Sequence, residues 1–278
     1  MGAGAKGQDV CGVEALASNR DLLTSTQMTS FKSKRHLSQN FLEDEGYQLQ
    51  IVSAGAYKKD DEVVEVGPGY GALTRHLSRL VSCIQLVELD GDAIAHLQGA
   101  MPKGCAKFIH ANILDVDLSD LGKCIRLIGN LPYHISSPIL LHVDRHRERI
   151  KDAIFMLQKE VVDRLVASPG EKAYGRLGIA LQIRWDIEWL FDVPPGAFRP
   201  APKVCSSVMC MRPRKNPPLV DETRLDQVLT IAFSKRRKTV RNALKGLFTE
   251  ADLVKCSIDP QARPENLSVD QYVQLANF

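Results

Sequence analysis

The sequence contains no apolar run that approaches the ~20 residues needed to span a bilayer, which argues against an integral membrane protein. Hydrophobic residues make up 44% and charged residues 25% of the 278 positions, as in an ordinary globular protein. A chain of this length suits one sizeable domain and a smaller one.

The first 30 residues lack the apolar core of a secretion signal. Asp9, Glu14 and Asp21 interrupt any amphipathic transit peptide. We therefore expect residues 1–30 to form a disordered tail or an upstream extension, with Met28 as a plausible alternative start. This segment does not indicate where in the cell the protein is located.

Closely spaced cysteine pairs are also absent, because the seven cysteines include no C-x-x-C motif. Their odd number and spacing favour unpaired thiols over disulfides or a zinc site. Cys83, Cys105 and Cys124 lie in or beside apolar, strand-like runs, where we expect each thiol to be buried as a small hydrophobe. The cysteines thus indicate a reducing, cytoplasmic environment and no bound metal.

Acidic residues are missing from two basic stretches, although the net charge is only +3. A solvated charged face would explain one such stretch. Two stretches, with three more cations near the start, favour a polyanionic partner such as nucleic acid. The cations are Lys235, Arg236, Arg237, Lys238, Arg241 and Lys245 in the first stretch, Arg199, Lys203, Arg212, Arg214 and Lys215 in the second, and Lys32, Lys34 and Arg35 near the start.

Strand-like and helix-like runs alternate between Glu62 and about Met211, which predicts an α/β fold with a mostly parallel sheet. The final two strand-like runs follow each other without a long helix, which predicts an antiparallel hairpin at one sheet edge. The expected strands are 62–66, 83–89, 107–111, 125–128, 152–158, 177–191 and 204–212, and the expected helices are 70–80, 92–101, 137–144 and 160–167.

The proline-rich, charged segment 212–218 reads as a linker. Beyond it, residues 222–232, 240–248, 250–254 and 269–276 have helical patterning. The sequence therefore predicts a larger domain over residues 31–212 and a small helical domain over residues 213–278.

Asn130-Leu131-Pro132-Tyr133 is the most informative short motif, because it follows an apolar run that predicts a buried strand. Polar groups just past the carboxyl end of such a strand lie where α/β proteins bind ligands. The side-chain amide, the carbonyl before the proline and the aromatic ring together suit a planar amine, which would be held by two acceptors and stacked on one face.

A glycine-rich turn, Glu65-Val66-Gly67-Pro68-Gly69-Tyr70-Gly71, lies between a predicted strand and a predicted helix. Glycines allow a ligand to approach the backbone closely, and this turn fits the pattern used for dinucleotide phosphates. Glu88 follows the next strand, where an acid accepts hydrogen bonds from ribose hydroxyls. Asn112 follows the third strand, and its side chain can meet an adenine edge, although a plain loop asparagine is the default interpretation.

A nicotinamide cofactor and S-adenosylmethionine both carry adenosine, so both suit these residues. Glu65 favours the methyl donor, because an acid beside the turn suits an amino-acid ammonium and repels a pyrophosphate. The planar-amine motif and the basic stretches also have no use in a nicotinamide oxidoreductase.

Six ordered motifs closely resemble the ribosomal RNA adenine dimethyltransferase family, from about Phe31 to the end of the chain. The small-subunit branch is the better match, and the large-subunit, antibiotic-resistance type is the main rival. One position departs from the family, which usually has aspartate where Asn112 stands, and this puts donor affinity in doubt. The motifs are Gln39–Leu42, Glu65–Gly71, Val87–Asp90, Asn130–Tyr133, Phe198–Val204 and Phe233–Asn242.

The resemblance implies a Rossmann-like class I methyltransferase that uses S-adenosylmethionine to dimethylate the 6-amino groups of two adjacent adenosines in a 3′-terminal hairpin loop of small-subunit ribosomal RNA. It further implies a monomer that acts on a pre-ribosomal particle and has a role in subunit biogenesis. The implied donor-site residues are Gln39, Asn40, Leu42, Glu65, Gly67, Gly69, Glu88, Leu89, Asn112, Ile113 and Asn130.

For catalysis, we expect the Asn130 side chain and the Leu131 carbonyl to accept hydrogen bonds from the target amine, with Pro132 fixing the backbone. Tyr133 would stack on the adenine and Phe198 would close its other face, unless Phe198 is a core aromatic. The residues expected to bind RNA phosphates are Arg199, Lys203, Lys235, Arg236, Arg237, Lys238 and Arg241.

Overall fold

The structure is a computed structural model that describes residues 40–278. The predicted tail, Gln39 and the three cations near the start lie outside the described residues. None of the helices in the described part is long and apolar enough to cross a membrane.

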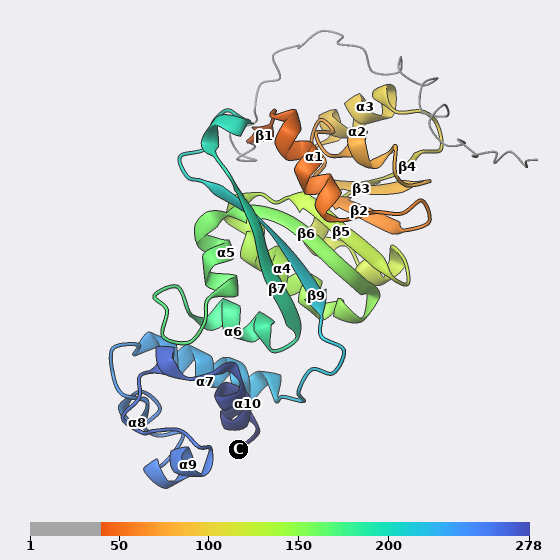
Figure 1. The fold of residues 1–278 in the computed structure, drawn as a ribbon. Helices are drawn as coiled ribbons and strands as arrows, with labels where there is room; N and C mark the ends of the chain where they lie inside the picture. Colours follow the sequence, from red (N-terminus) through yellow and green to blue (C-terminus); the bar gives the residue numbers. More distant parts are fainter. Residues whose placement is uncertain (1–39) are drawn as a thin grey trace, which may run out of the picture. The chain divides into compact units, whose positions relative to one another are not determined.

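The described chain is built on a seven-stranded mixed sheet with the order β4-β3-β2-β5-β6-β9-β7 (Figure 1). The first five strands in this order are parallel, whereas β9 is antiparallel to both of its neighbours. The predicted α/β fold with an antiparallel hairpin at one edge is therefore confirmed. The strands are β2 (Glu62–Val66), β3 (Ile84–Glu88), β4 (Ala106–His110), β5 (Ile125–Asn130), β6 (Ile150–Gln158), β7 (Trp185–Val193) and β9 (Ser206–Pro213).

Helices cover both faces of the sheet, because alternate side chains of each strand point to opposite faces. Along β6, Phe155 enters one hydrophobic cluster with residues of α4 and α5, while its neighbour Met156 enters a second cluster with residues of α1, α2 and α3. The helices are α1 (Glu45–Ala54), α2 (Thr74–Leu77), α3 (Gly91–Ala100), α4 (Ser136–Arg145), α5 (Lys159–Val166) and α6 (Arg176–Gln182).

A second, two-stranded sheet joins residues that are far apart in the sequence. Strand β1 (Phe41–Leu42) pairs antiparallel with β8 (Phe198–Arg199), and the Glu43 N–H donates to the Ala197 carbonyl at 2.8 Å. This pairing fixes the segment that leads into α1 beside the long connection between β7 and β9.

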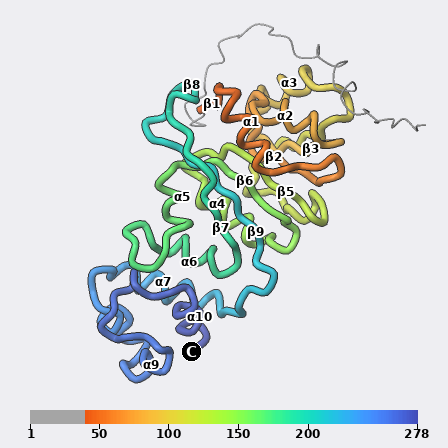
Figure 2. The backbone as a smooth tube through the Cα atoms, viewed as in Figure 1, coloured from red at the N-terminus to blue at the C-terminus, as the bar shows by residue number. Residues whose placement is uncertain are grey.

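Four helices form the carboxyl-terminal part, after the chain leaves β9 (Figure 2). Their hydrophobic cluster also contains Tyr174, Ile179 and Ile183, which precede the predicted linker. The division at residues 212 and 213 stays a prediction. The helices are α7 (Glu222–Ser234), α8 (Val240–Ala243), α9 (Glu250–Lys255) and α10 (Val269–Asn277).

Several expectations from the sequence are wrong, including the predicted helices 70–80 and 240–248, of which only Thr74–Leu77 and Val240–Ala243 are α-helix. The predicted strand 177–191 is helix α6 followed by β7, which begins only at Trp185. Apolar residues at Ile179 and Ile183 face the carboxyl-terminal cluster at helical spacing, so a run that looked continuous holds two elements. Cys83 and Cys124 are exposed, because each lies one residue before its strand begins.

Candidate functional site

The predicted ligand residues gather at the carboxyl edge of the parallel strands. Strands β3 and β4 extend the sheet to one side of β2, whereas β5 and β6 extend it to the other. The strand order therefore reverses between β2 and β5, and ligands bind at such a switch point in open α/β sheets. The Glu65–Gly71 turn, Glu88, Asn112 and Asn130 all lie at this edge.

The glycine turn after β2 adopts backbone conformations that favour glycine. Gly67, Gly69 and Gly71 have φ angles of +66°, +54° and +87°. A Cβ atom at Gly67 would meet nothing within 4 Å, so this part of the backbone is open to a ligand. The predicted helix 70–80 is reduced to the four residues of α2, and such a short helix offers little dipole for a pyrophosphate.

Glu88, at the end of β3, connects the glycine turn to the loop that follows β3. It is only 7% exposed, and its carboxylate accepts hydrogen bonds from the Gly69 N–H at 2.9 Å and from the Leu89 and Asp90 N–H groups at 2.8 Å. The adjacent Leu89 side chain is 52% exposed and presents an apolar surface beside this carboxylate.

Glu65 lies beneath the glycine turn and is 2% exposed. The Thr74 hydroxyl donates a hydrogen bond of 2.7 Å to its carboxyl group. Burial is the main cause that raises the pKa of Glu65 to about 8, and the charge of Glu88 adds to it, while the bond from Thr74 opposes the shift. Glu65 is therefore mostly protonated at pH 7 in this state.

Asn112 follows β4 and begins a short helical turn, residues Ile113–Asp115, through a bond from the Leu114 N–H to its Oδ1 at 3.1 Å. The Oδ1 atom is the acceptor in this bond, so the amide nitrogen is the end of the side chain that this bond leaves free. The Ile113 side chain is buried in the core cluster that includes Val66 and Val87.

Asn130 is the last residue of β5, and its amide nitrogen donates to the Asn40 carbonyl at 3.2 Å. This bond orients the side chain, because the Oδ1 acceptor must lie at the other end of the amide. The Leu131 N–H donates to the Met156 carbonyl at 3.1 Å, and the Leu131 side chain is buried. The Tyr133 hydroxyl lies 2.6 Å from the Ser206 hydroxyl.

Leu42 and Phe198 pair across the two-stranded sheet, and both side chains are buried in the same hydrophobic cluster. Phe198 is 5% exposed, so in this conformation it packs as a core aromatic, and its predicted contact with a target base stays a prediction. Arg199 is exposed and pairs with Glu43 at 3.0 Å, while Lys203 is exposed in the following loop.

The six cations around α7 and α8 divide into two groups. Arg236 binds Glu265 and donates to the Glu171 and Lys172 carbonyls at 3.4 and 2.8 Å. Arg241 lies 3.5 Å from Glu250. The other four form no ion pair with any residue in 40–278, and all are exposed: Lys235, Arg237, Lys238 and Lys245.

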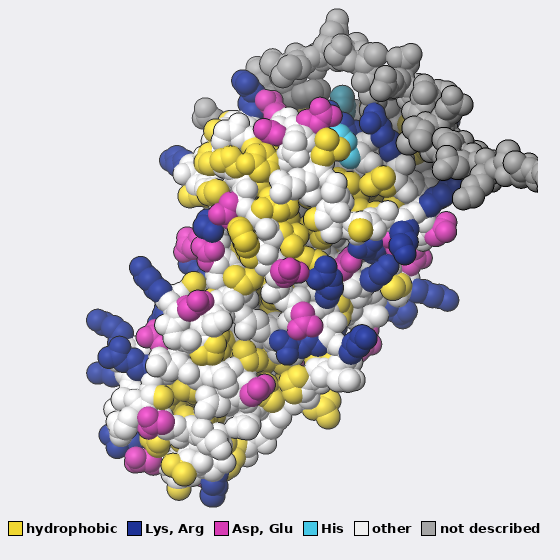
Figure 3. All heavy atoms as spheres, in the orientation of Figure 1, with side chains coloured by type: hydrophobic (Ala, Val, Ile, Leu, Met, Phe, Trp, Pro, Cys, Tyr) yellow, Lys and Arg dark blue, Asp and Glu magenta, His cyan; other side chains and the backbone are white. Residues whose placement is uncertain are grey.

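Arg236 brings the loop after α5 against the turn that follows α7. Cationic side chains gather along this edge of the molecule (Figure 3). Lys172 in that loop is exposed and forms no ion pair with a described residue, so it adds a cation to the same surface. This surface contains no residue of the planar-amine motif.

Sequence reasoning did not identify Thr74, Ser206 or Phe41 as residues that support the site. Thr74 lies nine positions after Glu65. This spacing places Thr74 on the helix that follows the glycine turn, within reach of Glu65 near the end of β2. Phe41 contacts Tyr70 edge to face, with 5.2 Å between the ring centroids. Ser206 is part of β9, and only the pairing of β9 with β6 brings it to the site.

The family model for ribosomal RNA adenine dimethylase matches residues 30–278 of this chain. A ribosomal RNA small subunit methyltransferase A from Herminiimonas arsenicoxydans is 45% identical over 248 residues, covering 88% of this chain and 97% of the relative. The same-named protein from Thiobacillus denitrificans is 46% identical over 247 residues, with the same coverage.

Solved structures show the same fold at lower identity. A dimethyladenosine transferase from Plasmodium falciparum has a TM-score of 0.75 at 24% identity, covering 84% of this chain and 95% of that one. The 23S rRNA methyltransferase ErmE has a TM-score of 0.65 at 23% identity, covering 86% and 98%. The match over all of the described residues, together with the close relatives, shows that this protein belongs to the ribosomal RNA adenine dimethylase family.

Proposed function

We propose that this protein transfers methyl groups from S-adenosylmethionine to the 6-amino nitrogens of two adjacent adenosines in a 3′-terminal hairpin loop of small-subunit ribosomal RNA. The relatives named small subunit methyltransferase A support the choice of RNA. The orientation of the Asn130 amide is the observation that carries the chemistry, because it turns an acceptor toward the place of an amine.

The residues at the sheet edge fit the methyl donor. The Glu88 carboxylate, already bound by three backbone N–H groups, keeps an acceptor site for a ribose hydroxyl, and the exposed Leu89 side chain offers an apolar surface for an adenine ring. The Asn112 amide nitrogen can donate to a ring nitrogen of that adenine. Glu65 suits the amino-acid ammonium, since a nearby cation would favour its ionised form. Bound S-adenosylmethionine supplies an electrophilic methyl group on its sulfonium.

The protein's own residues align and polarise the amine. In the first transfer the Asn130 Oδ1 and the Leu131 carbonyl accept the two N–H bonds of the amine, and in the second transfer one of them accepts the N–H that remains. These bonds draw the nitrogen toward a pyramidal geometry and aim its lone pair at the methyl group. Pro132 fixes the carbonyl of Leu131, and the Tyr133 ring, anchored through Ser206, stacks on the base. The methylated nitrogen is cationic and strongly acidic, so it releases a proton to water and no strong base is required.

The exposed cations support binding to RNA within a pre-ribosomal particle, by contacts that do not depend on base identity. We propose that the protein acts as a monomer in the cytoplasm, where a reducing environment suits the six unpaired cysteines of the described residues. Binding to the particle can also serve assembly of the subunit independently of methylation.

Replacing Asn130 by alanine tests the proposed function. We expect methylation of unmethylated small subunits, measured with labelled donor, to fall at least about 100-fold because the amine loses an acceptor. Affinity for the particle should be retained, because the surface formed by the cations around α7 and α8 contains no residue of the Asn130–Tyr133 motif. Asn216→Ala, an exposed position in the 212–218 segment, is the matched control. Full activity of Asn130→Ala, or label confined to large-subunit RNA, would refute the proposal.

A further inference from the structure

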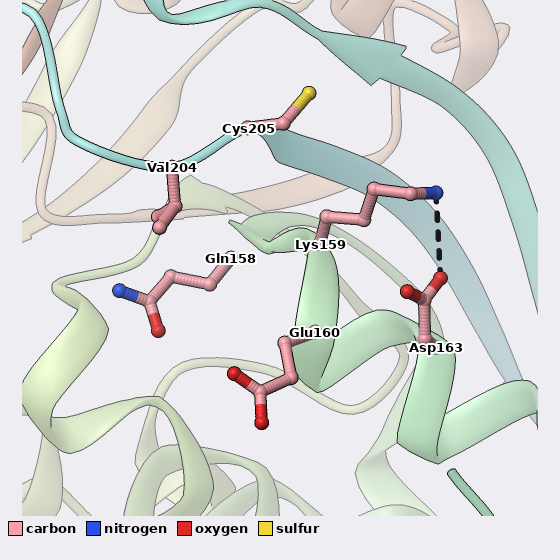
Figure 4. Close-up of a pocket in the computed structure, with 6 residues that line it drawn as sticks. All are labelled: Gln158, Lys159, Glu160, Asp163, Val204 and Cys205. Atoms are coloured by element: carbon pink, nitrogen blue, oxygen red, sulfur yellow. Dashed lines mark hydrogen bonds and ion pairs between the residues drawn. The ribbon is translucent and has the colours of Figure 1, made fainter. Parts of the chain in front are cut away.

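A hollow of about 340 Å³ lies at the carboxyl end of β6, between the start of α5 and the loop that precedes β9 (Figure 4). Its volume is within the range of small-molecule sites. Gln158 and Glu160 extend to the same side of the chain, with Val204 beside Gln158, whereas Lys159 extends away from them toward Asp163. The lining residues are Gln158, Lys159, Glu160, Asp163, Val204 and Cys205.

This hollow adjoins the planar-amine motif through β9. Gln158 is the residue of β6 that pairs with Ser206 of β9. The Ser206 hydroxyl in turn lies 2.6 Å from the hydroxyl of Tyr133, the residue proposed to stack on the target adenine. Along β6, Gln158 is two positions beyond Met156, whose carbonyl accepts the Leu131 N–H. A nucleotide next to the target base can therefore reach the hollow.

The charged side chains that line the hollow are paired within the protein. The Lys159 ammonium is bound by Asp163 at 3.4 Å and by Asp192 at 3.1 Å, so it is already neutralised. Arg164 is likewise bound by Glu160. Among the lining residues, the carboxylates of Glu160 and Asp163 outnumber the single cation Lys159, which favours an uncharged ligand that carries amino groups.

Gln158 and Val204 supply the groups that recognise a nucleobase. The Gln158 amide makes no hydrogen bond with any residue in 40–278, and it can both donate to and accept from one edge of an adenine. Val204 is 44% exposed and offers an apolar surface for the ring. Unstacked bases in RNA loops are read in this way, by their edges and faces together.

We propose that this hollow binds the adenine adjacent to the one being methylated, and that Gln158 reads its 6-amino edge. The proposal rests on the proposed function, because it assigns a place to the second of two neighbouring adenosines. With one adenine on Tyr133 and the other against Gln158, the loop is held in a fixed register. Gln158 thereby selects a sequence of two adenosines over an adenosine followed or preceded by another base.

The test uses reconstituted small subunits whose RNA is ligated to a synthetic 3′ fragment. The base adjacent to the labelled adenosine is either adenine or purine, which lacks the 6-amino group. We expect the unmodified protein to prefer adenine by about tenfold in kcat/KM, the effect of one paired amide. Gln158→Ala should methylate both RNAs at similar rates, at the level of the unmodified protein on the purine RNA. Gln98→Ala, at an exposed position on α3, is the matched control and should keep the preference.

Gln158→Met retains the length of the side chain without the amide, and it should lose the preference in the same way even if the alanine variant folds poorly. Equal preference for adenine in the unmodified protein and in both Gln158 variants would overturn the proposal. An equal loss of rate on both RNAs would also overturn it, since that result indicates a structural role. Absence of methylation of either RNA by the unmodified protein would instead contradict the proposed function.

Discussion

Glu65 is a residue whose proposed role in ligand binding comes with a loss of stability in the ligand-free protein. Its carboxyl group is buried, with Thr74 as its hydrogen-bond partner and Glu88 as the charged group that acts on it. Burial raises its pKa from 4.5 to about 8. Between these values the folded protein holds a proton that the unfolded chain has lost, so the free energy of unfolding falls as the pH rises from about 4.5 to 8.

We predict that Glu65→Gln removes this pH dependence and makes the empty protein more stable at pH 8.5 by on the order of a few kcal/mol. The same variant should bind S-adenosylhomocysteine at least about tenfold more weakly, because the ammonium of the ligand loses a carboxylate. Urea unfolding at pH 5.5 and 8.5, together with calorimetry, measures both effects. An unchanged affinity would show that Glu65 serves only the fold through Thr74.

The roles of single residues were predictable from the sequence where a motif combined a residue type with a strand end. Glu65, Glu88 and Asn130 were found in this way, and the structure brings all three to one sheet edge. The engagement of Arg236 within the protein was not predictable, since Glu265 and the Lys172 carbonyl come from distant segments. A basic run in a sequence does not distinguish cations that bind the protein itself from cations that face solvent.

Gly129 connects two elements of the site, because it lets β5 lie against the end of β2. A Cβ atom at this position would lie 2.4 Å from the Val66 carbonyl oxygen, a contact with backbone that no side-chain rotation relieves. Val66 immediately precedes the glycine turn, and Gly129 immediately precedes Asn130. The spacing between the donor-binding turn and the amine-binding motif therefore depends on this glycine.

We predict that Gly129→Ala lowers the free energy of unfolding by about 1–3 kcal/mol or more, as overpacking does in other cores. Methylation should fall by more than the loss of folded protein explains, because Asn130 shifts with the strand. Gly99→Ala in α3 is the control, since a Cβ there would meet nothing within 4 Å. That change should stabilise the helix by about 0.5–1 kcal/mol. Equal stability of the two variants, measured by urea unfolding, would contradict the packing argument.

At the level of elements, the sequence predicted the parallel strands well because each is a short apolar run with polar ends. The bounds of β2 agree with the prediction at both ends. Helix α1 was missed, since Gly46 and several polar residues weaken its pattern, although Asp44 caps it and Ile51 and Val52 are buried. Long-range pairing, such as β1 with β8, leaves no local signal at all.

At the scale of the whole molecule, the cations around α7 and α8, here called the basic surface, are of two kinds. Some bind other parts of the protein and form a frame, whereas others are exposed to solvent and form a contact layer. Arg236 is part of the frame, because it joins the turn after α7 to Glu265 and to the loop after α5. The Gly170 N–H donates to the Glu265 carbonyl at 2.7 Å in the same place. Arg237 and Lys238 lie beside it, are exposed and form no ion pair within residues 40–278. Neighbouring arginines should therefore differ in function.

We predict that Arg237→Gln weakens binding to unmethylated small subunits and reduces the slope of log K against log salt by about 0.7–0.9, the loss of one phosphate contact. Its melting temperature should not change. Arg236→Gln should instead lower the free energy of unfolding by about 1–2 kcal/mol, because Glu265 loses its partner. Under conditions where this variant is folded, its salt slope should stay within error of the unmodified protein.

Lys103→Gln, an exposed cation in the loop before β4, is the control for a change in net charge alone. It should alter neither the salt slope nor the stability, since β4 lies at the opposite edge of the sheet from the antiparallel hairpin. A reduced slope for Arg236→Gln with unchanged stability would mean that Arg236 exchanges Glu265 for a phosphate when RNA binds. The basic surface would then form only in the complex, and the frame seen in the free protein would be its resting state.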